Sequence, residues 1–183
     1  MTMKADFGEH HLETRLSLSV VAQELHADGL LSDTDYEHTK SAFGLKAHPL
    51  VYLAEQRFAN ASVPGATLTM AALLQWLGKR VNQEVYRIDP LKIDVTAIAE
   101  VMSRAFAERH RILAVDVSDD EVVIASAEPV VFGWESNLEH VLRKKIRRVL
   151  ADPREIARHT GDFYSVAGSV RGANRQEQQG SAA

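Results

Sequence analysis

The sequence contains no cysteine and no apolar run of the roughly 18 residues that a membrane-spanning helix needs. Without cysteine the chain can form neither a disulfide framework nor a thiolate metal site, which suits a reducing cytoplasm. The polar residues 1–11 lack the features of a secretory signal peptide. These absences favour a soluble, cytoplasmic protein.

Motifs that carry catalysis are also missing. The Gly-Lys pair at residues 78–79 falls inside a predicted helix and lacks the flanking glycine and the hydroxyl residue of a phosphate-binding loop. The histidines lack metal-ligand spacing, and we interpret His10 and His11 as part of a flexible terminus, residues 1–15. No serine nucleophile elbow occurs. The chain is therefore predicted to be no enzyme and to hold no metal or cofactor.

Charge is unevenly distributed along the 183 residues. Residues 1–140 contain 12 Lys and Arg against 21 Asp and Glu, a net charge of −9, whereas residues 141–183 contain 9 against 4, a net charge of +5. The simpler interpretation of this pattern is a solvated helix end; the alternative is a binding surface for an acidic protein or lipid headgroups. Nucleic acid is not expected as a partner, because the chain is acidic overall and has no basic motif interleaved with aromatic residues. The candidate partner-binding residues are Arg143, Lys144, Lys145, Arg147 and Arg148.

Residues 16–83 are predicted to form a helical subdomain. Ser17 or Ser19 can cap a first helix that ends at Gly29, and residues 32–35 form a capping box for a second. Pro49 begins a third helix at its first position, and Thr69 can cap a fourth. The expected inner faces are Tyr36, Thr39 and Phe43; Val51, Ala54 and Phe58; and Leu73, Trp76, Leu77 and Val81.

Residues 84–169 alternate between strand and helix patterns. A strand over Val85–Ile88 is followed by a helix over Val95–Arg109, which Asp94 caps. The β-branched runs Ile112–Val117 and Glu121–Ala125 are typical of a hairpin.

A helix from Trp134, a strand over Ile146–Leu150 and a helix beginning at Asp152-Pro153 complete the order β-α-β-β-α-β-α. This order predicts a small α+β sandwich with helices on one face of a mixed sheet. Residues 170–183 have no apolar period and are predicted to be a linker or tail.

Several segments of the second half carry a family resemblance. They are Tyr86-Arg-Ile-Asp-Pro-Leu-Lys-Ile-Asp94, Val101-Met-Ser-Arg-Ala-Phe106, Arg111-Ile-Leu-Ala-Val115 and Val122-Val-Ile-Ala-Ser-Ala-Glu-Pro129, extended by Trp134-Glu135, Leu138-Glu139, Arg148–Pro153 and Phe163-Tyr164. Together they resemble the N-terminal domain of the type II secretion and type IV pilus assembly ATPases, the general secretion pathway protein E family. The match covers about residues 16–172 and is specific from Val85 onward; before it, His48–Gln56 fits a proteobacterial branch.

The resemblance implies a role without chemistry of its own. In that family the module docks a hexameric motor ATPase, joined by a flexible linker, onto cytoplasmic parts of an inner-membrane platform. It therefore implies a non-catalytic docking or regulatory domain, cytoplasmic and peripheral to the bacterial inner membrane. ATP, magnesium and hexamer formation would belong to the motor domain, which this chain lacks, and residues 170–183 lie where the linker would begin.

A branch of the same family binds cyclic di-GMP through a repeated Arg-Leu-Gly motif. Its first copy can be placed on Val20–Leu31, where Val20 replaces the arginine and Ala22 the first glycine. The second copy falls on His48–Phe58, which contains no glycine. The alternative function is therefore a cyclic di-GMP sensor, and a standalone enzyme is a third hypothesis. The candidate nucleotide-binding residues are Leu25, Gly29, Leu30 and Leu31.

Overall fold

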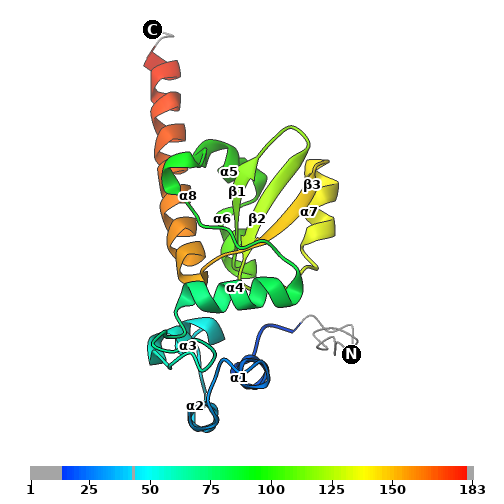
Figure 1. Ribbon diagram of the computed structural model, residues 1–183. Helices are drawn as coiled ribbons and strands as arrows, with labels where there is room; N and C mark the ends of the chain where they lie inside the picture. The colour runs from blue at the N-terminus through cyan, green and yellow to red at the C-terminus, as the bar shows by residue number, and fades with distance from the viewer. Residues whose placement is uncertain (1–13, 43, 181–183) are drawn as a thin grey trace. The chain divides into compact units, whose positions relative to one another are not determined.

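The computed structural model describes residues 14–42 and 44–180, and the side chains as far as residue 173 (Figure 1). The chain divides into two compact units. Unit 1 comprises the chain up to Gln83 together with Glu128–Gly133, and unit 2 comprises Glu84–Ala127 and the chain from Trp134 onward. The sequence prediction assigned Glu128–Gly133 to the second subdomain, whereas its contacts place it in unit 1. Residues 1–13 of the predicted flexible terminus lie outside the described residues.

Unit 1 is built from four helices that begin at the predicted positions. Each is capped by the side chain before it, which accepts a hydrogen bond from a backbone N–H of the first turn. The capping side chains are, in order, those of Ser17, Ser32, His48 and Thr69. The helices are α1 (Leu18–Ala27), α2 (Asp33–Thr39), α3 (Pro49–Gln56) and α4 (Met70–Val81).

The core of unit 1 consists mainly of leucines. Leu25, Leu50, Leu53, Leu73 and Leu77 are fully buried. The predicted inner face of α3 was correct at Phe58, which is buried, and wrong at Val51 and Ala54, which are only partly covered. Leu50 and Leu53 are buried in their place. The prediction for α4 was better, since Leu73, Trp76 and Leu77 are buried together with Leu74. Phe43 lies outside the described residues.

Unit 2 is organised around a three-stranded mixed sheet. The strands β1 (Ile112–Val117), β2 (Glu121–Ser126) and β3 (Lys145–Leu150) lie in the order β1-β2-β3. β1 and β2 form the predicted antiparallel hairpin, and β3 runs parallel to β2. The helix α7 (Glu135–Leu142) lies between β2 and β3 along the chain and provides the crossover that a parallel pair requires.

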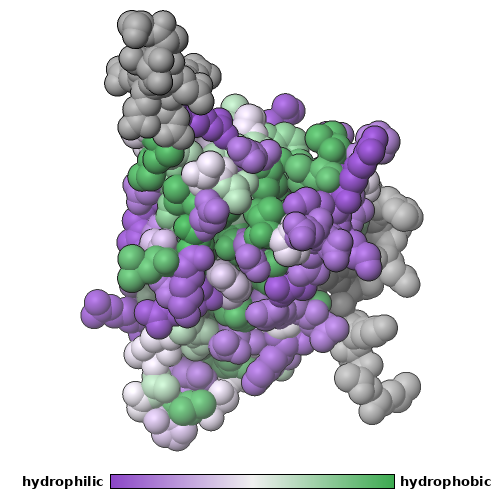
Figure 2. All heavy atoms as spheres, turned by 90° about the horizontal axis from the view of Figure 1, so that it is seen from above, coloured by the Kyte–Doolittle hydropathy of each residue, from purple (hydrophilic) through white to green (hydrophobic). Residues whose placement is uncertain are grey.

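Three helices contact β1. They are α5 (Val95–Val101), α6 (Arg104–His110) and α8 (Pro153–Gly180), and α8 also contacts β2, α5 and α6. The buried residues of α8 within its first 15 positions are Ile156, His159, Thr160, Phe163 and Ala167, a single stripe at helical spacing. On one face of the molecule, hydrophobic residues reach the surface between polar ones (Figure 2).

The predicted first strand is the main correction in unit 2. Val85–Ile88 forms only an isolated parallel bridge between Val85 and Leu150, and the 3₁₀-helix η1 (Pro90–Lys92) follows. The amide of Tyr86 donates to the Leu150 carbonyl (2.7 Å), and the Leu150 amide donates to the Glu84 carbonyl (2.8 Å). Pairing cannot extend further, because the residues opposite Tyr86–Ile88 lead into Pro153, where α8 begins.

The predicted single helix over Val95–Arg109 is two helices. Met102 is extended (φ −153°, ψ 162°), and Ser103 starts α6 by accepting a hydrogen bond from the amide of Phe106. The carbonyl of Met102 accepts a hydrogen bond of 2.8 Å from the hydroxyl of Tyr164 on α8. This donor satisfies a carbonyl that the helix break leaves without an intrahelical partner.

The predicted linker from Val170 is helical. α8 continues to Gly180, and residues 168–173 are exposed on all sides (Figure 1, orange to red). No proline follows Pro153, and each glycine costs a helix only about 1 kcal/mol relative to alanine, so the helix has no strong stop signal there.

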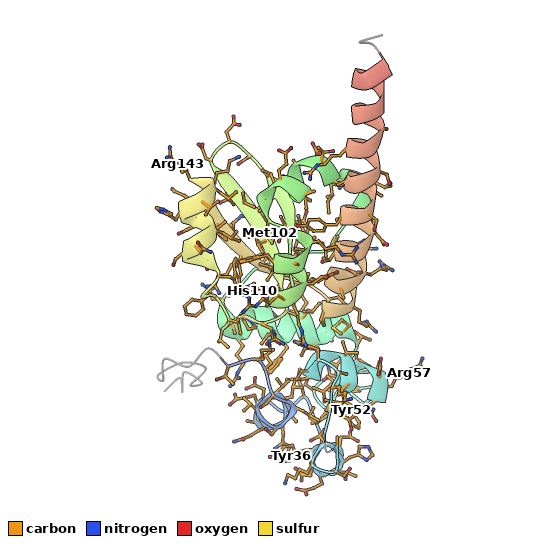
Figure 3. All side chains as sticks on the ribbon, turned by 180° about the vertical axis from the view of Figure 1, so that it is seen from behind. Tyr36, Tyr52, Arg57, Met102, His110 and Arg143 are labelled. Carbon is orange, nitrogen blue, oxygen red and sulfur yellow. The ribbon has the colours of Figure 1, made fainter. Side chains whose placement is uncertain are left out.

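Replacing Tyr164 by phenylalanine tests the hydrogen bond at the helix break. Loss of the hydroxyl is expected to lower the free energy of unfolding by about 1 kcal/mol, because the Met102 carbonyl loses its donor. Tyr52→Phe is the control, since the hydroxyl of Tyr52 makes no hydrogen bond with the described residues (Figure 3 labels Tyr52 and Met102). Urea denaturation measures both variants.

Tyr164 also predicts an alkaline dependence of stability. Burial raises the pKa of Tyr164 to about 12, so the folded state binds the phenolic proton more tightly than the unfolded state does. This contribution is complete below the ordinary tyrosine pKa near 10 and is lost as the pH rises towards 12. Wild type should therefore lose more stability over this interval than Tyr164→Phe; parallel pH profiles would contradict the assignment.

Candidate functional site

The predicted basic surface lies at the end of α7 and along β3. Arg143 is the left-handed C-cap of α7 (φ 54°), and Lys145 is the first residue of β3. Figure 3 shows Arg143 at the end of α7, close to the turn of the β1–β2 hairpin. The ammonium of Lys144 donates to the carbonyl of Ser118 in that turn (2.6 Å). Arg143, Lys144 and Lys145 thus come together in space.

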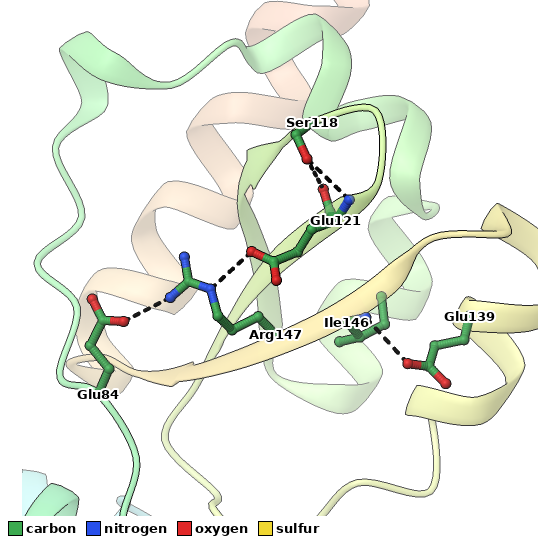
Figure 4. A network of polar contacts seen from close by, with 6 residues as sticks. All are labelled: Glu84, Ser118, Glu121, Glu139, Ile146 and Arg147. Atoms are coloured by element: carbon green, nitrogen blue, oxygen red, sulfur yellow. Dashed lines mark hydrogen bonds and ion pairs between the residues drawn. The ribbon is translucent and has the colours of Figure 1, made fainter.

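Arg147 is held by two carboxylates on one face of the sheet. Its guanidinium contacts Glu84 (Nη1–Oε2 2.7 Å) and Glu121 (Nε–Oε1 3.0 Å), as Figure 4 shows. The hydrogen bond to Glu121 is the main cause that raises the pKa of Arg147. All three side chains are at least 40% exposed, so the two ion pairs add little to the stability of the fold. The two carboxylates nevertheless compensate the positive charge of Arg147.

Arg148 is separated from Arg147 because neighbouring residues of a strand point to opposite faces. Its Nε lies 2.9 Å from Oε2 of Glu135 at the start of α7. The predicted cluster therefore splits into two parts. Arg147 and Arg148 are ion-paired, whereas Arg143 and Lys145 are exposed and form no ion pair with the described residues.

A surface depression adjoins the two exposed cations. It is lined by Arg143, Lys144 and Lys145 together with Asp120 and Glu139. Glu139 is engaged there, since its Oε1 accepts a hydrogen bond from the amide of Ile146 (3.3 Å), an outward-facing group of β3. The depression combines cationic rims with carboxylates, so it can bind an acidic group at its edge through Arg143 and Lys145.

The nucleotide-binding candidates form the C-terminal cap of α1. The amide of Leu30 donates to the carbonyl of Leu25 (2.9 Å), and that of Gly29 to the carbonyl of His26 (3.0 Å). This pattern is the Schellman motif, and Gly29 has the left-handed conformation that it requires (φ +72°). Leu25 and Leu31 are buried and Leu30 is partly covered. The four residues thus have a structural role in the cap.

A polar cluster beside this cap escaped the sequence analysis. The guanidinium of Arg80 on α4 contacts Asp28 (Nη1–Oδ2 2.6 Å) and Glu24, both from the α1 segment, and lies over the ring of Trp76 (5.8 Å to the centroid). The indole of Trp76 also donates to Asp28 (2.7 Å). Burial lowers the pKa of Arg80.

The signal that could have found this cluster is the spacing of its members. Glu24 and Asp28 are four residues apart, as are Trp76 and Arg80, so each pair shares one helix face. Two acids on one face of the α1 segment and an arginine beside a tryptophan on one face of α4 favour a contact between those faces.

The described part of the chain carries neither a metal-binding cluster nor a membrane-spanning helix. Residues 14–42 and 44–180 contain no group of three side chains suited to a metal ion. Over the same ranges no helix is both long and apolar enough to cross a membrane. The predicted terminal histidines, His10 and His11, lie outside the described residues.

Comparison with known proteins relates the chain to one group. Residues 81–170 match the model of the MshEN domain family. The type IV pilus assembly ATPase TfpB of Acinetobacter baylyi is 38% identical over 144 residues, covering 78% of this chain and 24% of the relative. The chain thus spans about a quarter of that relative's length.

One of the similar solved structures shares the fold. A structure of MshE with cdg has a TM-score of 0.55 and 18% identity, over 82% of this chain and 100% of that chain. The N-terminal domain of XpsE has a TM-score of 0.43 and 11% identity, over 81% and 96% of the two chains. The likeness to MshE confirms the predicted α+β fold of helices with a small mixed sheet.

Two glycine substitutions test the structural role of Gly29. Gly29→Ala is expected to lower the free energy of unfolding by about 1 kcal/mol, because alanine is strained at φ +72°. Gly161→Ala in α8 is the matched control and should raise it by roughly 0.5–1 kcal/mol, since a Cβ there meets nothing within 4 Å. Thermal or urea unfolding measures both, and a neutral Gly29→Ala would contradict the cap.

Proposed function

We propose, because the chain belongs to the family of N-terminal domains of type II secretion and type IV pilus assembly ATPases, that it is the docking domain of such a motor. It couples a motor domain in the same polypeptide to cytoplasmic parts of an inner-membrane platform. The observation that carries this proposal is the 38% identity to a pilus assembly ATPase of which the chain spans only 24%. The domain then works in the cytoplasm without chemistry of its own, and ATP and magnesium act in the motor.

The exposed end of the basic surface is the contact that we assign to the partner. Arg143 and Lys145 project from a turn and a strand end, next to Val141, of which 68% is exposed. An apolar side chain flanked by unpaired cations is suited to an acidic segment that carries an apolar residue. Arg147 and Arg148, already paired with carboxylates, are expected to contribute less.

Charge reversal tests the docking role. In the double variant Arg143→Glu, Lys145→Glu, the dissociation constant for the cytoplasmic domain of the cognate platform protein should rise on the order of tenfold and its salt dependence should weaken. Lys79→Glu, an exposed residue of α4 in unit 1, is the control for net charge. Titration calorimetry measures the affinity. Unchanged affinity would show that Arg143 and Lys145 do not contact the partner. If the wild-type domain formed no complex with any cognate platform domain, the docking function itself would be contradicted.

Cyclic di-GMP binding is a second candidate. It is supported by the similarity in fold to MshE, whose structure contains cdg, an abbreviation of cyclic di-GMP. The chain lacks the motif arginine at Val20, but Arg80 and Trp76 lie beside Asp28 at the cap of α1. A guanidinium and an indole ring are groups that recognise guanine, although here a nucleotide would compete with Glu24 and Asp28 for Arg80.

Titration with the dinucleotide decides this candidate. Binding through unit 1 should give saturable heat, and NMR shift changes should cluster on Val20–Leu31 and on the indole of Trp76. Arg80→Lys should weaken binding, because lysine cannot replace the planar guanidinium. A flat titration at high micromolar concentration would exclude the sensor function while leaving the docking role unaffected.

A further inference from the structure

Glu128 is a buried carboxylate that the proposed function does not use. Only 4% of its side chain is exposed, and it begins the segment Glu128–Gly133, which belongs to unit 1. Its Oε2 accepts a hydrogen bond of 2.7 Å from the amide of Leu16, and its Oε1 lies 3.5 Å from Nε2 of His48. A carboxylate buried without such partners would cost several kcal/mol, so these contacts account for its position.

His48 makes two contacts that determine which of its ring nitrogens carries the hydrogen. Its Nδ1 accepts a hydrogen bond from the amide of Leu50 (3.2 Å), which caps α3. In a neutral imidazole whose Nδ1 accepts, Nε2 carries the hydrogen and can donate it, and Nε2 is the atom that faces Glu128. One buried ring, 6% exposed, therefore joins the start of α3 to Glu128.

Glu128 thus joins three segments that lie far apart in the sequence. They are the chain entering α1 at Leu16, the start of α3 at His48, and the Glu128–Gly133 segment itself. The same segment is also held by the side-chain amide of Gln83, which donates to the carbonyl of Pro129 (3.3 Å). Its backbone forms a turn in which the amide of Val131 donates to the carbonyl of Glu128 (3.1 Å).

The residues on either side of this segment belong to unit 2. Ala127 directly follows β2, and Trp134, which is 4% exposed, directly precedes α7. The chain therefore leaves unit 2 after β2, takes part in unit 1 for six residues, and returns to unit 2 before α7. The segment Glu128–Gly133 is thus a short covalent route along which a displacement of Glu128 can reach Trp134.

We propose that Glu128 is a positioning residue that couples the starts of α1 and α3 to the start of α7. A change at Leu16 or His48 alters its contact with the Glu128 carboxylate, and the change is carried through Glu128–Gly133 to Trp134. This coupling goes beyond the proposed function and does not depend on it, because it concerns the route of the chain and holds for any partner or ligand of unit 1.

Hydrogen exchange of the His48→Asn variant tests the coupling. Asparagine is a good N-cap, so α3 keeps its cap while the contact between the ring and Glu128 is lost. The amides of residues 128–138 should exchange on the order of tenfold faster, although His48 is far from them in sequence. The reason is that the lost hydrogen bond to a charged group lowers the free energy of local opening. Amides of the hairpin, Val122–Ala125, should be unchanged.

A matched variant separates coupling from general destabilisation. His38→Asn makes the same substitution at an exposed position of α2 and should leave residues 128–138 unchanged. Glu128→Gln keeps an acceptor for the amide of Leu16 and should reproduce the effect of His48→Asn. If His48→Asn does not fold, Glu128→Gln provides the test of the coupling. Acceleration confined to α3, or equal acceleration of all amides, would overturn the proposal.

Discussion

The double pairing of β2 is the constraint on which unit 2 depends. Val122, Val123, Ile124 and Ala125 are all buried, so both faces of this strand are covered, and its two edges pair with β1 and β3. Because β3 is parallel to β2, the chain cannot return through a tight turn and must make a crossover. That crossover, residues 127–144, contains both α7 and the segment that joins unit 1. The parallel pairing thus requires the crossover, and within that crossover the chain enters unit 1 and returns to unit 2.

The local signals of the sequence predicted the helix starts well. The caps at Ser32, Thr69 and Asp94 and the Asp152-Pro153 start depend on hydrogen bonds within three residues, which the sequence displays directly. The errors arose where a residue distant in the sequence determines where a helix or strand ends. The break at Met102 is stabilised by Tyr164, 62 residues later, and the Val85 strand ends because Pro153 begins a helix opposite it.

The candidate site was predicted in composition but not in arrangement. The cluster from Arg143 to Arg148 is real, yet strand alternation sends its last two arginines to opposite faces, where Glu121 and Glu135 compensate them. The opposite orientation of the two arginines could have been predicted from the strand pattern. Which carboxylates lie beside them depends on the sheet register, which the sequence does not show. Glu128 had no signal at all: a lone glutamate before a proline reveals nothing until its burial is known.

The length of α8 has a geometric meaning. Each helical residue advances the chain by about 1.5 Å and turns it by roughly 100°, so a helix fixes direction and azimuth together. Ala167 is the last buried residue of α8 among the side chains described, which reach residue 173, and the helix itself continues to Gly180. The helix would therefore fix both the direction of a segment attached to its end and the rotation of that segment about the helix axis. Inserting a single residue after Ala167 would rotate it by more than a quarter turn, whereas an irregular linker would absorb the change.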